Sequence, residues 1–314
     1  MLAYVARRLV WSLILILLVA SIIFFLVRMV PADVVDILFS TSVGSSFQRE
    51  QLREFFGLGR PLHVQYGDWI SGLVRGDLGL SFRTGTPVLQ QIISKLPATL
   101  EIVLLGQLLA VLCGIPLGIA AARRRNTIVD LLIQPLGLLG LSIPSFWLCS
   151  MLLIILSIVA RGFNPIGYVP FFIDPLTNLR VVALPAFSLA FVSMAEIMRV
   201  TRSSVLEVLN QEYIRSARAK GLRERDVVYK HALRNALLPI VTLIGVDIGV
   251  LLGGTIVLEE VMAVPGVGRL LVTAIHQRDY PVIQGATVVL SGCFIAINLI
   301  TDVLYSWIDP RIRL

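Results

Sequence analysis

Long runs of uncharged, mostly apolar residues alternate with short polar segments along the chain. The first run, 9–27, holds 19 residues between Arg8 and Arg28. That length spans a bilayer and exceeds the core of a usual signal peptide, so we interpret it as a retained membrane helix. Asp247 is the only charged residue in the fifth run. The expected spans are 9–27, 102–122, 131–160, 181–195, 235–258 and 282–301.

The third run, 131–160, is longer than one span requires. Pro135 and Pro144 lie inside it, and proline removes a backbone hydrogen bond from the interior of a helix. We therefore expect this span either to start late or to contain a kink.

The composition excludes a soluble domain and indicates an all-α integral membrane protein with six transmembrane helices. Of 314 residues, 56% are hydrophobic and only 15% are charged, and the mean hydropathy is +0.85. The net charge of +7 does not indicate nucleic acid, because the basic residues lie mainly beside apolar runs without interleaved aromatics. Cys113, Cys149 and Cys293 lie in apolar stretches without paired spacing, which favours packing over metal or redox roles.

Basic residues beside the short loops predict the orientation. Arg7 and Arg8 precede the first span, residues 123–125 are all arginine after the second, and Arg311 and Arg313 close the chain. Because cytoplasmic loops carry the excess of Lys and Arg, both termini are expected in the cytoplasm.

The long segment 31–96 is expected outside, which divides the chain into 1–30, 31–96 and a core transmembrane domain, 97–314. Around Trp69 this segment is amphipathic. It lies either at the membrane interface, with Trp69 as an anchor, or as a structural cap on the bundle.

The charged segment 210–239 has the sequence signals of a helical hairpin. Asn210 is suited to cap a first helix, Glu212 lies in its first turn, and Gly221 follows Lys220 where a left-handed stop belongs. We interpret the segment as a docking element. The alternative is an ordinary cytoplasmic loop that collects Lys and Arg.

A second helix is expected directly after this turn. Glu224 and Asp226 lie near its start, where acidic side chains are favourable. Lys230 follows Asp226 by four residues, the spacing of a partner on the same helical face.

Two features of the fifth span indicate a packing or functional role. Gly245, Gly249 and Gly253 recur every four residues, so they form a stripe on which another helix can pack closely. Asp247 lies on a different face. An ionisable residue inside a span usually faces a bundle interior or water, which makes Asp247 either a residue of a substrate pathway or a structural acid with a polar partner.

The sequence contains no motif of a self-contained active site. It has no Walker-type phosphate loop, no His-Glu-x-x-His, no nucleophile elbow and no cysteine pairs with metal spacing. Its histidines, His63, His231 and His276, lie far apart in the sequence. We therefore expect neither catalysis nor a metal site on this chain.

The runs 213–222 and 231–239 resemble the coupling loop, or EAA motif, of bacterial ABC importer permeases. Arg215, Ser216 and Ala217 stand where the general motif has Glu-Ala-Ala, and Gly221 supplies its glycine. The departures at Arg215 and Ser216, and Arg234 in place of proline, are typical of the oligopeptide, dipeptide and nickel branch.

The resemblance covers nearly the whole chain. Two departures are Ala32, where the family usually has glycine, and Asp247, where many relatives carry glutamine. We expect the second departure to bear on substrate preference. The other resembling segments are 4–9, 58–66, 76–88, 96–101, 144–147, 201–209, 265–270, 278–284 and 309–313.

The resemblance implies an ABC type I importer permease fold in the bacterial inner membrane. It implies a second homologous permease, two cytoplasmic ATPases that bind ATP and Mg²⁺, an extracytoplasmic binding protein and membrane lipid as partners, with no cofactor on this chain. Substrates of the family include dipeptides, oligopeptides, nickel chelates and glutathione. Within the coupling loop 207–234, the ATPase-coupling residues are expected to be Glu212, Arg215, Ala217, Arg218, Ala219, Lys220, Gly221, Leu222, His231 and Arg234.

Other classes explain less of the sequence. An ion-coupled secondary transporter or channel predicts repeated halves and a relay of charges inside the membrane, whereas only Asp247 lies well inside a span. A membrane enzyme needs convergent catalytic residues, and a structural scaffold leaves the hairpin unexplained.

Overall fold

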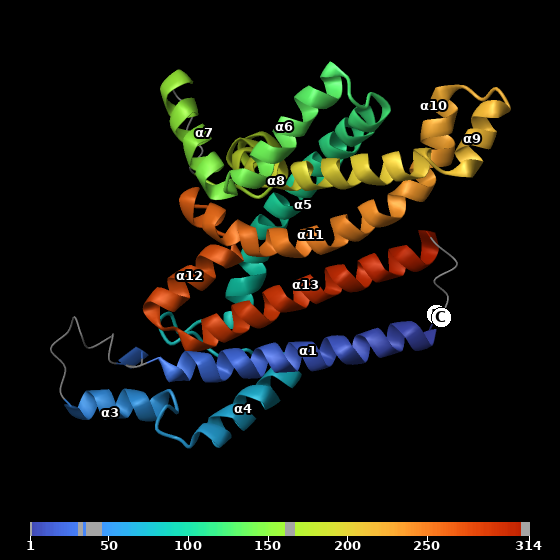
Figure 1. The fold of residues 1–314 in the computed structure, drawn as a ribbon. Helices are drawn as coiled ribbons and strands as arrows, with labels where there is room; N and C mark the ends of the chain where they lie inside the picture. The colour runs from blue at the N-terminus through green and yellow to red at the C-terminus, as the bar shows by residue number, and fades with distance from the viewer. Residues whose placement is uncertain (1, 31–33, 36–45, 161–166, 309–314) are drawn as a thin grey trace. The chain divides into compact units, whose positions relative to one another are not determined.

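The computed structural model describes residues 2–30, 34–35, 46–160 and 167–308 and is helical throughout these ranges apart from turns, bends and one isolated bridge between Leu80 and Pro87 (Figure 1). Ala32 and 309–313, which the sequence analysis singled out, lie outside the described residues. The helices are α1 (Leu2–Met29), α3 (Ser46–Phe55), α4 (Leu62–Val74), α5 (Val88–Arg123), α6 (Ile128–Ser142), α7 (Ser145–Val159), α8 (Pro175–Leu209), α9 (Glu212–Ala219), α10 (Glu224–Asp226), a π-helical segment (Val227–Ala232), α11 (Leu233–Val261), α12 (Val267–Gln277) and α13 (Tyr280–Ile308).

The described residues contain five helices that are long and apolar enough to cross a membrane, or six if one bent pair forms a single span. This confirms the all-α membrane fold. The spans are longer than the apolar runs predicted, because α5 begins at Val88 and α8 continues to Leu209. An apolar run marks only the part of a helix that meets lipid, and a helix continues into water wherever its polar ends are stabilised.

The third span is broken. Helices α6 and α7 meet at an angle of 102°, and Pro144 is the residue immediately before α7. Pro144 lacks the N–H that would continue the hydrogen-bond ladder of α6, and proline disfavours helical backbone at the residue before it. The kink expected in this run is therefore present, at Pro144. Pro135 lies inside α6, which continues past it.

The chain divides into two compact units, and each is described here by itself. The first comprises Leu100–Val264 and Ala296–Leu314. In it α8 packs against α6, α7 and α11. The carboxylate of Asp174 caps α8, accepting hydrogen bonds from the Thr177 hydroxyl at 2.5 Å and from two backbone N–H groups at 3.1 Å, and these bonds hold the pKa of Asp174 below its usual value.

A column of small residues on α5 lets that helix approach α8 closely. A methyl group added at Gly106, Gly114 or Gly118 would lie 3.1, 3.0 or 2.6 Å from a backbone oxygen of α8, and Ala110 between them is fully buried. Side chains larger than these would separate the two helices. This four-residue repeat is visible in the sequence, but our sequence analysis singled out only the one on the fifth span.

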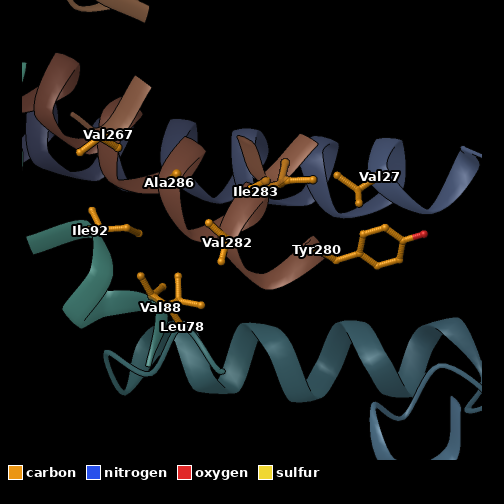
Figure 2. Packing of buried hydrophobic residues seen from close by; sticks show 10 residues of the cluster. Val27, Leu78, Val88, Ile92, Val267, Tyr280, Val282, Ile283 and Ala286 are labelled. Atoms are coloured by element: carbon orange, nitrogen blue, oxygen red, sulfur yellow. The ribbon is translucent and has the colours of Figure 1, made fainter. Parts of the chain in front are cut away.

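The second unit comprises Leu2–Thr99 and Pro265–Ile295. Its core brings together apolar side chains from α1, the segment before α5, the start of α5, α12 and α13 (Figure 2). Asp279, just before α13, accepts hydrogen bonds from the Ser81 hydroxyl at 2.5 Å and the Phe82 N–H at 3.0 Å, which fixes the 75–87 loop to that helix. The labelled core residues are Val27, Leu78, Val88, Ile92, Val267, Tyr280, Val282, Ile283 and Ala286.

Candidate functional site: the 212–234 hairpin

The predicted hairpin is present, with one helix end assigned wrongly from the sequence. Asn210 ends α8, and Gln211, not Asn210, precedes the first residue of α9. Both ends of a helix expose unpaired backbone groups, so a residue suited to helix ends does not reveal which helix it terminates. Gly221 has a φ of +77°, the left-handed conformation that the sequence predicts for the turn.

The second arm differs from the expected separate helix. Helix α10 is only Glu224–Asp226, and it continues through the π-helical segment Val227–Ala232 into α11 (Figure 1). The hairpin is thus a direct extension of a membrane-spanning helix. Glu224 forms an ion pair with Arg218 across the turn, at 2.8 and 3.2 Å, and this bond raises the pKa of Arg218. Among the described hairpin residues no ion pair joins Asp226 to Lys230.

A buried core fixes the hairpin to the spans beside it. Ile214 of α9 packs with Val227 and Ala232 of the second arm and is fully buried. Val228 packs with residues of α5, α8 and α11 in a separate cluster. The Asn235 amide also donates a 2.7 Å hydrogen bond to the Tyr213 hydroxyl, which joins α9 to the start of α11. Movement of the hairpin is therefore tied to movement of the spans.

The predicted coupling residues divide by exposure. Ala217 is buried and packs inside the hairpin, and His231 is half-buried. A cavity of about 370 Å³ lies between the hairpin and the end of α5, lined in part by Arg123, Arg124 and Tyr229. The exposed members are Glu212, Arg215, Arg218, Ala219, Lys220, Gly221, Leu222 and Arg234.

One ion pair near the hairpin was missed from the sequence. Arg202 lies about two turns before the end of α8. It donates two hydrogen bonds of 2.8 Å to the carboxylate of Asp130 at the start of α6. The side chain of Asp130 is 1% exposed, and the Asn126 N–H donates to it at 3.1 Å. The two residues are far apart in sequence, so the only signal was that each is a charged residue close to the polar end of a span.

Asp247 has a polar partner inside the first unit. It is buried on α11 and accepts a hydrogen bond from Ser193 of α8. Gln107 of α5 lies near it, yet the buried amide nitrogen and oxygen of Gln107 complete no hydrogen bond with the described residues. Three helices thus contribute polar groups at one place in the membrane, which is consistent with both roles that the sequence left open.

The glycine stripe of α11 packs closely against another helix at its Gly245 end. Gly245 lies directly against Thr301 of α13, where an added methyl would overlap that side chain. Gly249 is buried, whereas nothing lies within 4 Å of a methyl added at Gly253. Close packing therefore requires glycine at Gly245 but not at Gly253.

Side chains of the metal-binding type do not gather in the described part of the chain. No group of three or more His, Cys, Asp or Glu residues is arranged to hold a metal ion there.

Comparison with known proteins agrees with this architecture along the whole chain. Residues 1–103 match the family described as binding-protein-dependent transport system membrane component, N-terminal, and residues 114–314 match the binding-protein-dependent transport system inner membrane component. The chain is 40% identical over 317 residues to the oligopeptide transport system permease protein AppB of Bacillus subtilis, covering 100% of both chains. It is 38% identical over 337 residues to the dipeptide transport system permease protein DppB of Escherichia coli, covering 100% of this chain and 99% of DppB. The hairpin, the spans and these matches together show that the chain belongs to the inner-membrane permease components of binding-protein-dependent transport systems.

Proposed function

We propose that the chain is one of two permease subunits of an ATP-driven importer and that its hairpin receives the motion of cytoplasmic ATPases. The observation that carries the proposal is the hairpin itself, because its outer surface is exposed while its inner surface is packed on three spans. An exposed element with a rigid attachment transmits force without deforming. ATP and Mg²⁺ would be held by the ATPases, since this chain has no phosphate loop.

The Asp130–Arg202 pair supplies a second connection in this scheme. It joins α6 to the part of α8 that leads into the hairpin. A bidentate pair fixes the orientation of both helices more tightly than an apolar contact, because two parallel hydrogen bonds define an angle as well as a distance. Hairpin motion would then reach α6 as well as α8 and α11, and the helices would exchange outward and inward openings as rigid bodies.

Peptides are the proposed substrate class. The support is that two relatives aligned over their full length are named as oligopeptide and dipeptide permeases. A binding protein would deliver the peptide to the outer face, and both termini of the chain would lie in the cytoplasm.

We place Asp247 on the proposed pathway, where a carboxylate would favour a cationic peptide amino terminus. Its cluster with Ser193 and the unpaired Gln107 supports this role. Asp247→Asn removes the charge at nearly constant volume, so uptake of free peptides should fall several-fold relative to uptake of their N-acetylated forms. Ser193→Ala, which removes the partner and keeps the carboxylate, is the control. An unchanged ratio for Asp247→Asn would assign Asp247 a structural role only.

A substitution series at Gly221 tests the docking proposal. Nothing in this chain lies within 4 Å of a methyl group added at Gly221, so a substitution there acts on the chain itself only through the backbone. Valine strains the left-handed conformation by roughly 1–2 kcal/mol, whereas asparagine tolerates it. With Gly221→Val we expect substrate-stimulated ATPase activity of the assembled complex to fall several-fold while membrane insertion is unchanged.

Gly221→Asn is the matched control and should retain most of the coupling. Amounts of each variant in the membrane, measured by immunoblot, separate loss of protein from loss of coupling. Wild-type stimulation in the Gly221→Val complex would show that the ATPases do not dock at this turn.

A further inference from the structure

A second cavity, of about 250 Å³, lies wholly within the second unit. Its walls come from five segments: the end of α1, the 56–61 connection before α4, α4 itself, the 75–87 loop and the start of α13. The volume is below the roughly 300–1,000 Å³ typical of pockets for drug-sized ligands, and it suits a small polar group. Two of its lining residues, Leu78 and Tyr280, belong to the apolar core shown in Figure 2.

Two buried polar groups in this cavity have no partner. The indole N–H of Trp69 and the amide nitrogen of Gln284 are buried and form no hydrogen bond with the described residues. Gln284 is only 2% exposed. A buried donor without an acceptor costs about 1–3 kcal/mol, so two in one cavity indicate that a ligand supplies the acceptor.

Arg28 adds a positive charge at the same place and is held there by the protein. Its Nε donates to Gln65 at 3.0 Å, its Nη1 donates to the Phe24 carbonyl at 3.2 Å, and its guanidinium lies 3.6 Å from the centre of the Phe24 ring. These contacts orient a cation into the cavity that Trp69 and Gln284 also line. The three residues together suit an anionic oxygen group.

The remaining lining residues suit a positive group. The carboxylates of Asp68 and Asp77 balance Arg28 and Arg60 among the lining side chains. The rings of Phe56 and Phe82 lie 4.4 Å apart, centre to centre, and their faces attract an ammonium ion. A zwitterion thus fits this cavity better than a ligand of net negative charge.

The cavity lies at a membrane boundary. The span of α1 ends at Met29, directly after Arg28, and the span of α13 begins at Tyr280, which also lines the cavity. The apolar window of α1 is only 11% buried, against 67% for α8, so most of this helix is left uncovered by the rest of the chain. Leu18, Ile22 and Phe25 are exposed along α1 at helical spacing, leading toward Arg28.

We propose that this cavity binds the headgroup of a zwitterionic phospholipid, with the phosphodiester on Trp69, Gln284 and Arg28 and the ammonium between the aromatic rings and the carboxylates. The acyl chains then lie along the exposed face of α1. Trp and Arg at a membrane boundary commonly contact headgroups, but here they line one cavity together with buried donors that have no acceptor.

Native mass spectrometry of the full chain, purified with its partner subunits, tests the proposal. We expect the wild type to bind one phosphatidylethanolamine at this site and to prefer it to phosphatidylglycerol. Trp69→Phe keeps the ring and removes the donor, so the affinity should fall about tenfold, as for a lost hydrogen bond to a charged group. Trp11→Phe makes the same chemical change on the exposed part of α1, 63% exposed and outside the cavity, and should leave binding unchanged.

Gln284→Met removes the second donor at similar volume and should weaken binding to a similar extent. Equal binding by the wild type and both cavity variants would overturn the proposal, as would an equal loss in Trp11→Phe. Inorganic phosphate and glycerophosphoethanolamine are added as competitors. Displacement of the lipid by free phosphate at matched concentration would show a site for a soluble oxyanion, which also overturns the lipid assignment. None of these outcomes depends on transport or ATPase activity.

Discussion

Two arginine–carboxylate pairs connect neighbouring elements of the first unit with almost the same geometry but in different surroundings. Arg202 binds Asp130 through two hydrogen bonds of 2.8 Å, and Arg218 binds Glu224 through two of 2.8 and 3.2 Å. The side chain of Asp130 is 1% exposed, whereas that of Glu224 is 52% exposed.

This difference in exposure indicates that the two ion pairs have different roles. Water screens the exposed pair, so it contributes little to stability and is free to exchange partners. The buried pair cannot lose one member without leaving a charge in a medium that solvates it poorly. One pair is therefore suited to a surface that meets and releases a partner, and the other to a permanent joint.

Loss of Arg202 has the largest expected effect. Arg202→Gln leaves the Asp130 carboxylate buried without its cation, which should destabilise the protein by about 3 kcal/mol, the lower end for broken buried pairs because Arg202 is 25% exposed. Thermal unfolding of the purified chain measures this. Arg202→Lys, which keeps a charge but loses the bidentate geometry, is the control and should lose less. If Arg202→Gln lowers the free energy of unfolding by less than about 1 kcal/mol, the buried pair contributes no more to stability than an exposed, screened pair.

Removal of both charges sharpens the comparison with a smaller effect. In Asp130→Asn/Arg202→Gln no unpaired charge remains, so much of the lost stability should return, leaving a deficit of about 1–2 kcal/mol. If transport by this double variant stays low while its unfolding temperature recovers, the pair positions α6 for coupling. Recovery of both together would assign it to stability alone.

The smallest effect on stability is expected at the exposed pair. Glu224→Gln should change the free energy of unfolding by less than about 1 kcal/mol, because water already solvates both partners. Substrate-stimulated ATPase activity is the sensitive measurement, since Arg218 is released to the docking surface. The exchange Arg218→Glu/Glu224→Arg restores the pair and should recover wild-type unfolding. A large loss of stability in Glu224→Gln would contradict the assignment of a screened surface pair.

The spans were predictable because lipid selects for uncharged residues over a fixed thickness. The kink near Pro144 was predictable for a local reason, since proline acts on its own turn. The position of Asn210 was not, because α8 continues well past the apolar run 181–195 and reaches Asn210 from the other side. Where a helix ends in water depends on capping residues and packing, and the length of an apolar run does not predict either of them.

Contacts between residues far apart in the sequence limited how much of the candidate site could be predicted. Gly221 was identified because a left-handed turn demands glycine locally, and its φ is +77°. Asp130 and Arg202 are 72 residues apart, and no periodicity of either helix links them. The donors of Trp69 and Gln284 are recognised as unpaired only once five segments of the chain are brought together around the cavity.

The π-helical segment Val227–Ala232 holds one extra residue between the hairpin and α11. A π turn contains about one residue more than an α-helical turn for nearly the same rotation, so the helix continues past it almost in phase. Deleting a single residue there would allow continuous α-helix and would leave the hairpin on nearly the same side of the helix axis. The extra residue therefore changes the backbone hydrogen bonds beside the hairpin without changing the face that the hairpin presents to a partner.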